Sequence, residues 1–187
     1  MISDDQILTA CQQWVEQFIV QHSICPFARP VVESQQLGYK LISATDTEQS
    51  LIEVMGQIQQ LQVNEEPETL LMILPAWQND FNGFLNVLDI ANVLLDEHDL
   101  KSTFQLASFH PEYLFEGEPE QDCSHYTNRS PWPMIHIIRQ QSISNALKSF
   151  ANPERIPERN IDLMNQLGKA HLKTQLEQLQ GLKTDEQ

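Results

Sequence analysis

The sequence predicts an α/β fold, in which a βαβαβ core forms a mostly parallel sheet of about four strands, with an N-terminal helix and C-terminal helices packed around it. Apolar runs of strand length alternate with longer segments whose apolar residues recur every three or four positions. The run Thr69–Leu74 is continuous, which is typical of a strand buried on both faces. The first three strands are therefore expected to be parallel, with right-handed crossovers.

The first helix is predicted over Ser3–His22. Ser3 and Gln6 form a capping-box pattern, and the two aspartates between them suit the positive end of the helix dipole. Apolar residues then recur with helical spacing at Ile7, Cys11, Trp14, Val15 and Phe18. Pro26 ends this pattern and belongs to a constrained turn.

Strands and helices alternate in the next part of the chain. The strands are predicted at Tyr39–Ala44, Thr69–Leu74 and Thr103–Phe109. A helix capped by Thr45 connects the first two strands, and a helix that begins at Asn79 or Asp80 connects the second and third. In such sheets, ligands bind beyond the carboxyl ends of the strands.

The C-terminal part of the chain is predicted to be mainly helical after one more strand. Met134–Ile138 is expected to be the fourth strand, with a helix start as the alternative. Helices are predicted over Ser142–Phe150 and from Pro157 to about His171. Residues 1–171 then form a single α/β domain, and residues 172–187 form a polar, frayed helical tail.

The composition restricts the partners and the compartment. The formal net charge of −15 makes nucleic acid and anionic membranes poor partners, because the protein surface repels phosphate. The three cysteines lack the spacing of a disulfide framework, which indicates a reduced protein. The sequence also shows no long apolar run and no basic leader, so a cytoplasmic protein is expected. With six glycines and no glycine-rich phosphate loop, no cofactor is expected. Any anion must bind through a locally basic pocket.

Cys25 is the best candidate nucleophile. It lies in a proline-bracketed turn, with Arg29 four residues further along the chain. A nearby cation lowers the pKa of a thiol and increases the thiolate fraction. The alternative is that Cys25 is a small buried hydrophobic residue beside the turn.

The segment from Phe109 to Arg139 is the richest in functional side chains. His110 follows a predicted strand, where a catalytic base can lie, and His136 lies within the fourth strand with Arg139 close behind it. We predict His110 and His136 as catalytic residues beside Cys25. The alternative for both histidines is a structural role, with the imidazole hydrogen-bonded to the backbone.

The polar stretch that ends this loop is predicted to bind an anion. Arg129 offers a planar fork for carboxylate or phosphate, and Asn128 and Ser130 can supply further donors. Arg29 and Arg139 are included in the predicted ligand-binding set. The alternative is that these side chains hold the loop to the body of the protein.

A zinc site is a third possibility for the loop. Cys123, His125, His110 and His136 are ligand types that zinc prefers. Their spacing matches no zinc motif, so no metal-binding residue is predicted.

Three segments of the sequence resemble a known family. They are Cys25-Pro26-Phe27-Ala28, Phe109-His110-Pro111, and Tyr126-Thr127-Asn128-Arg129-Ser130-Pro131 together with His136 and Arg139. The chain resembles, over nearly its whole length to about Ala170, an uncharacterised bacterial family catalogued as domain of unknown function 1415. The resemblance implies no particular activity. His125 and Cys123 look particular to this chain.

These observations favour a cytoplasmic protein with a polar pocket that binds a small anionic metabolite, with a thiol-dependent transformation as a further step. Whether the protein is an enzyme stays open at this stage. The alternatives are a non-catalytic protein-interaction module that uses the loop 110–133, and a metal-binding protein. The thiol mechanism predicts that the side chains of Cys25 and His110 lie within roughly 8 Å of each other.

Overall fold

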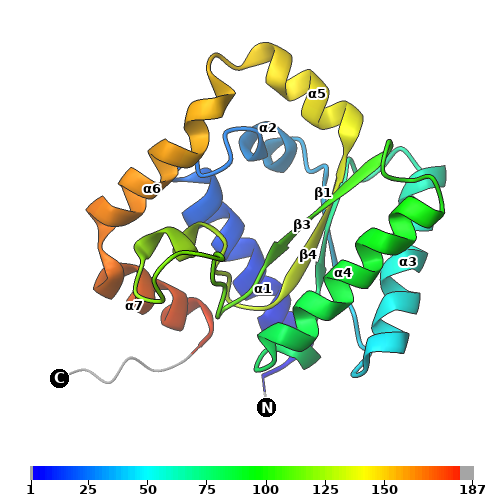
Figure 1. Ribbon diagram of the computed structural model, residues 1–187, viewed down its shortest axis with the longest axis horizontal. Helices are drawn as coiled ribbons and strands as arrows, with labels where there is room; N and C mark the ends of the chain where they lie inside the picture. The colour runs from blue at the N-terminus through cyan, green and yellow to red at the C-terminus, as the bar shows by residue number, and fades with distance from the viewer. Residues whose placement is uncertain (1, 182–187) are drawn as a thin grey trace.

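The computed structural model describes residues 2–181, which contain a four-stranded sheet with helices on both faces (Figure 1). The strands are β1 (Leu37–Leu41), β2 (Thr69–Ile73), β3 (Phe104–Phe109) and β4 (Met134–Arg139). The helices are α1 (Asp4–Trp14), its π-helical continuation η1 (Val15–Val20), α2 (Ala28–Glu33), α3 (Thr47–Val63), α4 (Phe81–Glu97), α5 (Gln140–Ser149), α6 (Ile156–Leu167) and α7 (Lys169–Leu179). Short 3-10 turns occur at η2 (Pro75–Trp77), η3 (Cys123–Thr127) and η4 (Pro153–Arg155).

The sheet is mixed, so the prediction of a mostly parallel sheet was wrong. The strand order is β1-β2-β4-β3; β1 pairs with β2 in parallel, whereas β4 is antiparallel to both β2 and β3. The first three strands do run in one direction, as expected from the helices that connect them, and β2 and β3 are one strand apart. The long loop after β3 carries no crossover helix, so β4 returns in the opposite direction and inserts between them.

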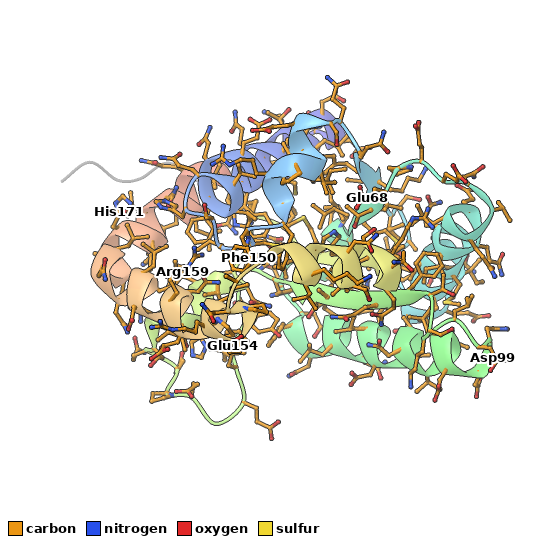
Figure 2. The ribbon with its side chains drawn as sticks, turned by 90° about the horizontal axis from the view of Figure 1, so that it is seen from above. Glu68, Asp99, Phe150, Glu154, Arg159 and His171 are labelled. Atoms are coloured by element: carbon orange, nitrogen blue, oxygen red, sulfur yellow. The ribbon has the colours of Figure 1, made fainter. Side chains whose placement is uncertain are left out.

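The two faces of the sheet pack against different helices, as Figures 1 and 2 show. One face carries Met72 and Ile137 and is covered by α3 and α4. The other carries Leu71 and Ile73 and faces α1, η1, α6 and α7. We call the second one the cavity face, because a large cavity lies against it.

Local sequence signals explain where the helices begin. Ser3 and Gln6 form the expected capping box at α1. Asp46, one residue after the predicted cap, accepts the backbone N–H of Gln49 at 2.9 Å and starts α3. Asp80, one of the two residues predicted for this position, caps α4 in the same way.

The predicted helix from Pro157 to about His171 is two helices. Gly168 has a φ of 78°, which side-chain-bearing residues rarely adopt, and it separates α6 from α7. The predicted domain boundary after residue 171 falls inside α7, where Leu172 is buried against the cavity-face core. Residues 182–187 of the predicted tail lie outside the described part of the chain.

None of the helices within residues 2–181 is long and apolar enough to span a lipid bilayer.

Candidate functional site

A cavity of ≈ 800 Å³ lies between the cavity face of the sheet and the helices α2, η1, α5 and α6. Its volume is within the range of about 300–1,000 Å³ that is typical of small-molecule sites. Most of its lining is apolar and includes Val15, Ile19, Phe27, Val31, Val32, Leu37, Leu71, Ala107, Phe109, Phe115, Ile138, Ile143, Ala146, Ile156 and Ile161. The polar lining residues are Cys25, Glu68, Thr69, Glu116, Glu118, Ser124, Thr127, Asn128, His136, Ser142 and Asn160.

Two helical segments shape the cavity walls. The π-helical segment η1 widens the end of the first helix and places Val15 and Ile19 on the cavity side. On another side, α5 contributes Ile143 and Ala146, although none of its described side chains is fully buried. Seen from above in Figure 2, α5 lies in front of the strands, with α1 and α2 on one side and α4 on the other; Phe150, labelled there, follows its end. The cavity is therefore walled partly by a helix that has few packing partners.

His136 is a polar side chain on the apolar floor of this cavity. Its Nε2 lies 2.6 Å from Thr69 Oγ1, and Thr69 Oγ1 donates its only proton to the carbonyl of Ile137 at 2.5 Å. The hydroxyl oxygen must therefore accept a hydrogen bond from His136 Nε2–H. This leaves Nδ1 unprotonated, with its lone pair available as an acceptor. Burial lowers the pKa of His136 to about 4, so the ring is neutral near pH 7.

Cys25 lines the same cavity. Its side chain is accessible from the cavity space, yet protein atoms surround it on most sides, and this burial raises the pKa of the thiol. Hydrogen bonds from the backbone N–H groups of Phe27 and Ala28 lower the pKa by a smaller amount. Cys25 is thus a protonated thiol at neutral pH. Arg29 does not lower the pKa of the thiol as expected; its guanidinium donates to the carbonyl of Val20 and lies beside Glu33.

Cys25 is expected to react with iodoacetamide faster than Cys11 but slowly in absolute terms. Cys11 is fully buried and burial raises its pKa to about 12, so it should react only on unfolding. Each unit by which the pKa of a thiol is raised lowers the thiolate fraction at neutral pH about tenfold. Mass spectrometry of the labelled peptides measures both rates, with half-buried Cys123 as an internal comparison. Rapid labelling of Cys25 at pH 7 would contradict the raised pKa.

His110 does not join Cys25, because it lies on the opposite face of the sheet. Its ring is fully buried between Phe81 and Phe84 of α4, with ring centroids 4.9 and 5.3 Å away. Nδ1 accepts the N–H of Glu112 at 3.0 Å, so Nε2–H donates to the carbonyl of Trp77 at 3.0 Å. Both nitrogens are occupied, and burial lowers the pKa. The structure supports the structural alternative for His110 rather than a catalytic base.

His125 has the same arrangement as His110. Its Nδ1 accepts the N–H of Phe115 at 3.1 Å, and Nε2 donates to the carbonyl of Pro119 at 2.9 Å. These bonds fix the shape of the long loop between β3 and β4. Within residues 2–181, no three His, Cys, Asp or Glu side chains are grouped closely enough to hold a metal ion.

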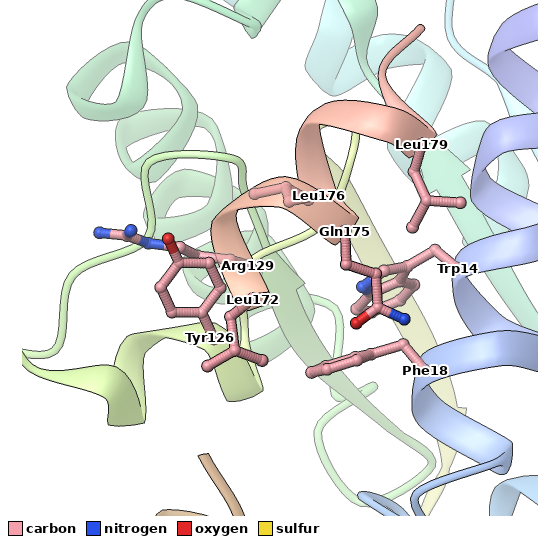
Figure 3. Close-up of a pocket in the computed structure, with 8 residues that line it drawn as sticks. All are labelled: Trp14, Phe18, Tyr126, Arg129, Leu172, Gln175, Leu176 and Leu179. Atoms are coloured by element: carbon pink, nitrogen blue, oxygen red, sulfur yellow. The ribbon is translucent and has the colours of Figure 1, made fainter. Parts of the chain in front are cut away.

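Arg129 lies outside the cavity and is half-buried against its own loop. This position agrees with the alternative interpretation, in which the side chain holds the loop in place. Its Nε donates to the carbonyl of Tyr113 at 3.2 Å, and the guanidinium lies 4.7 Å from the centre of the Tyr126 ring. Figure 3 shows the guanidinium directed away from Trp14 and Phe18 at the other end of a hollow of ≈ 10 Å³. This hollow is only large enough for about one water molecule.

The two other predicted arginines are also held by protein groups. Arg139 donates to the carbonyls of Leu61, Asn64 and Glu68 at 2.9, 2.7 and 3.1 Å, and so holds the end of α3 to the start of β2. Arg29 is exposed, 3.8 Å from Glu33. Neither side chain lines the cavity.

Asn128 and Ser130 have clear structural roles. Asn128 Nδ2 donates to the carbonyl of Ser108 at 3.1 Å and thereby ties the loop to β3, while part of the residue lines the cavity. Ser130 is fully buried and donates to the carbonyl of Trp132 at 2.6 Å. Of the eight predicted site residues, the cavity brings together Cys25, Asn128 and His136.

Sequence reasoning missed Thr69 and Asn160. Thr69 begins the apolar run of β2 and orients His136 from the neighbouring strand, 67 residues away. Asn160 Nδ2 donates to the carbonyl of Ile24 at 2.8 Å and fixes the turn before Cys25 to α6. The sequence shows only a polar residue close to apolar ones at each position. This pattern does not identify the distant residue to which the side chain bonds.

Fold and site together define an α/β protein with a mixed sheet and a large, mainly apolar cavity on one face. The chain belongs to the family described as Protein of unknown function (DUF1415), whose model matches residues 6–174. This match confirms the family resemblance and covers every strand and every helix that lines the cavity. No curated protein and no solved structure matches the chain.

Proposed function

We propose that the protein binds a small, mainly apolar molecule in the cavity between the sheet and the helices α2, η1, α5 and α6. The observation that carries the proposal is the cavity itself, whose ≈ 800 Å³ are enclosed mostly by aliphatic and aromatic side chains. Sites of this kind combine an apolar wall with a few polar groups that orient the ligand. Here His136, Thr69 and Cys25 are such groups.

The lining does not favour the anionic metabolite that the sequence suggested. Among the described residues that line the cavity there is no lysine or arginine, whereas Glu68, Glu116 and Glu118 are present. A carboxylate or phosphate that enters would lose its hydration without gaining a cationic partner. We therefore propose a small molecule with a mainly apolar body as the ligand, in place of an anionic metabolite.

A thiol-dependent reaction is the second candidate, because Cys25 and His136 face the same cavity. The pKa of the thiol is raised and the pKa of the imidazole is lowered, so the proton of Cys25 stays on sulfur in the resting protein. A thiolate–imidazolium pair would need both pKa values to be shifted in the opposite directions. Binding without chemistry is therefore the function that the geometry supports best.

Ala107→Phe tests the binding function. Ala107 pairs with His136 across the sheet and lines the cavity, so a phenyl ring at this position fills part of the ligand space. The uncharged fluorescent probe N-phenyl-1-naphthylamine should bind to the natural protein, and Ala107→Phe should weaken this binding about tenfold, which corresponds to about 1.4 kcal/mol.

Ala170→Phe is the matched control, because Ala170 is an exposed residue of α7 that does not line the cavity. It should bind the probe as the natural protein does. Equal weakening in both variants, or no binding by the natural protein, would refute the proposed function. Circular dichroism verifies that each variant is folded.

A further inference from the structure

We propose that the ligand of the cavity carries a neutral hydrogen-bond donor, such as a hydroxyl group, on an apolar body, and that this donor bonds to His136 Nδ1. The proposal rests on the proposed function, since it names the ligand class of the same cavity.

The hydrogen-bond chain at the cavity floor fixes what His136 offers to a ligand. The carbonyl oxygen of Ile137 can only accept, so the Thr69 hydroxyl donates to it, and the same hydroxyl accepts a hydrogen bond from His136 Nε2–H. Nδ1 is therefore an acceptor, and the described residues provide no hydrogen bond to it. Nδ1 is not one of the fully buried atoms without a partner, so solvent can reach it from the cavity. A ligand that covers Nδ1 must replace the water donor: a hydroxyl group does so, whereas an apolar group leaves the acceptor unpaired.

The surroundings of His136 show why the donor belongs to an apolar molecule. The register places Leu71 on one neighbouring strand and Ala107 on the other directly beside His136. Ile138 lies on the same face of β4 and also lines the cavity, and the ring of Phe109 has its centroid 6.4 Å from the imidazole. The neighbours of His136 on the floor of the cavity are thus mainly apolar, so Nδ1 can bind one donor while the rest of the ligand is oriented by packing.

The charges of the cavity disfavour an anionic head group on the same apolar body. A carboxylate placed at Nδ1 would bring its lone pairs against the lone pair of the nitrogen. Proton uptake by the imidazole is disfavoured, because burial lowers its pKa to about 4. The charged residues that line this space, Glu68, Glu116 and Glu118, are also negative. A fatty alcohol fits these constraints, whereas the corresponding fatty acid anion does not.

Four probes with ten-carbon chains test the proposal: decan-1-ol, decyl methyl ether, decanoate and decylammonium. Each probe competes with N-phenyl-1-naphthylamine for the protein, at concentrations below the solubility limit or the micelle concentration of that probe. Decan-1-ol should bind about fivefold more tightly than the ether, because one neutral hydrogen bond contributes about 1 kcal/mol. Decanoate should bind less tightly than both. In His136→Phe, the alcohol and the ether should bind equally.

His98→Phe is the matched control, since His98 is exposed at the end of α4 and does not line the cavity; it should keep the preference for the alcohol. The comparison of alcohol and ether in the natural protein needs no variant, so it holds even if His136→Phe fails to fold. The head-group assignment alone would be overturned by any of three results. These are equal affinities of the alcohol and the ether in the natural protein, tightest binding of decanoate or of decylammonium, and a preference for the alcohol that persists in folded His136→Phe. Failure of all probes to bind would overturn the binding function as well.

Discussion

Arg139→Ala is expected to lower the free energy of unfolding by about 3 kcal/mol, because it removes several hydrogen bonds from a charged donor to backbone carbonyls. The guanidinium bonds to Leu61, Asn64 and Glu68 and lies 5.6 Å from the ring centre of Phe104. Without it, carbonyls that are partly buried lose their donor. The segment between α3 and β2 would loosen, and so would the start of the strand that carries Thr69.

Urea denaturation followed by circular dichroism measures this loss. Arg139→Lys should be intermediate, because an ammonium keeps the charge but cannot reach the carbonyls with a planar fork. Arg155→Ala is the matched control: its ion pair with Glu158 is 3.9 Å long with both side chains largely exposed, so the midpoint should hardly change. An unchanged midpoint in Arg139→Ala would show that the arginine is free for another role, such as the anion binding predicted from the sequence.

The sequence identified the elements of the fold but not the direction of every strand. Helical and strand periodicity located the four strands and most helices, because burial imposes these periods on each segment by itself. The direction of β4 depends on how the loop 110–133 returns to the sheet. That return is fixed by the hydrogen bonds of His110, His125 and Asn128, which join distant residues and leave no periodic signal.

The site could be predicted only in part, for a similar reason. Residue type singled out Cys25 and His136, and both line the cavity. Position at a strand end also singled out His110, but its side chain turns to the α3–α4 face, where it is enclosed by aromatic rings. The apolar part of the cavity wall, which includes Ile19 and Phe109, has the same sequence pattern as a packed core. Only the three-dimensional arrangement shows that the space between them is unfilled.

Acidification from pH 6.5 to pH 4 is expected to lower the free energy of unfolding by up to roughly 3 kcal/mol through His136 alone, at about 1.4 kcal/mol for each unit of the pKa difference. Burial lowers the pKa of His136 in the folded protein from 6.5 to about 4. Between these values the unfolded chain binds a proton that the folded protein does not. Stability is therefore fully present above pH 6.5 and declines as the pH falls toward 4.

His136→Phe should reduce this pH dependence, and urea midpoints at pH 7, 6, 5 and 4.5 measure it. A part of the decline should remain, because burial also lowers the pKa values of His110 and His22. Ala107→Phe is the control, since it changes the packing beside His136 and keeps the titrating ring. If the free energy of unfolding of His136→Phe fell with decreasing pH as steeply as that of the natural protein, the imidazole of His136 would already be solvated in the folded protein.

Decan-1-ol at a saturating concentration should make the free energy of unfolding fall more steeply as the pH approaches 4. A ligand donor bonded to Nδ1 stabilises the neutral ring further, and a proton would have to displace this donor.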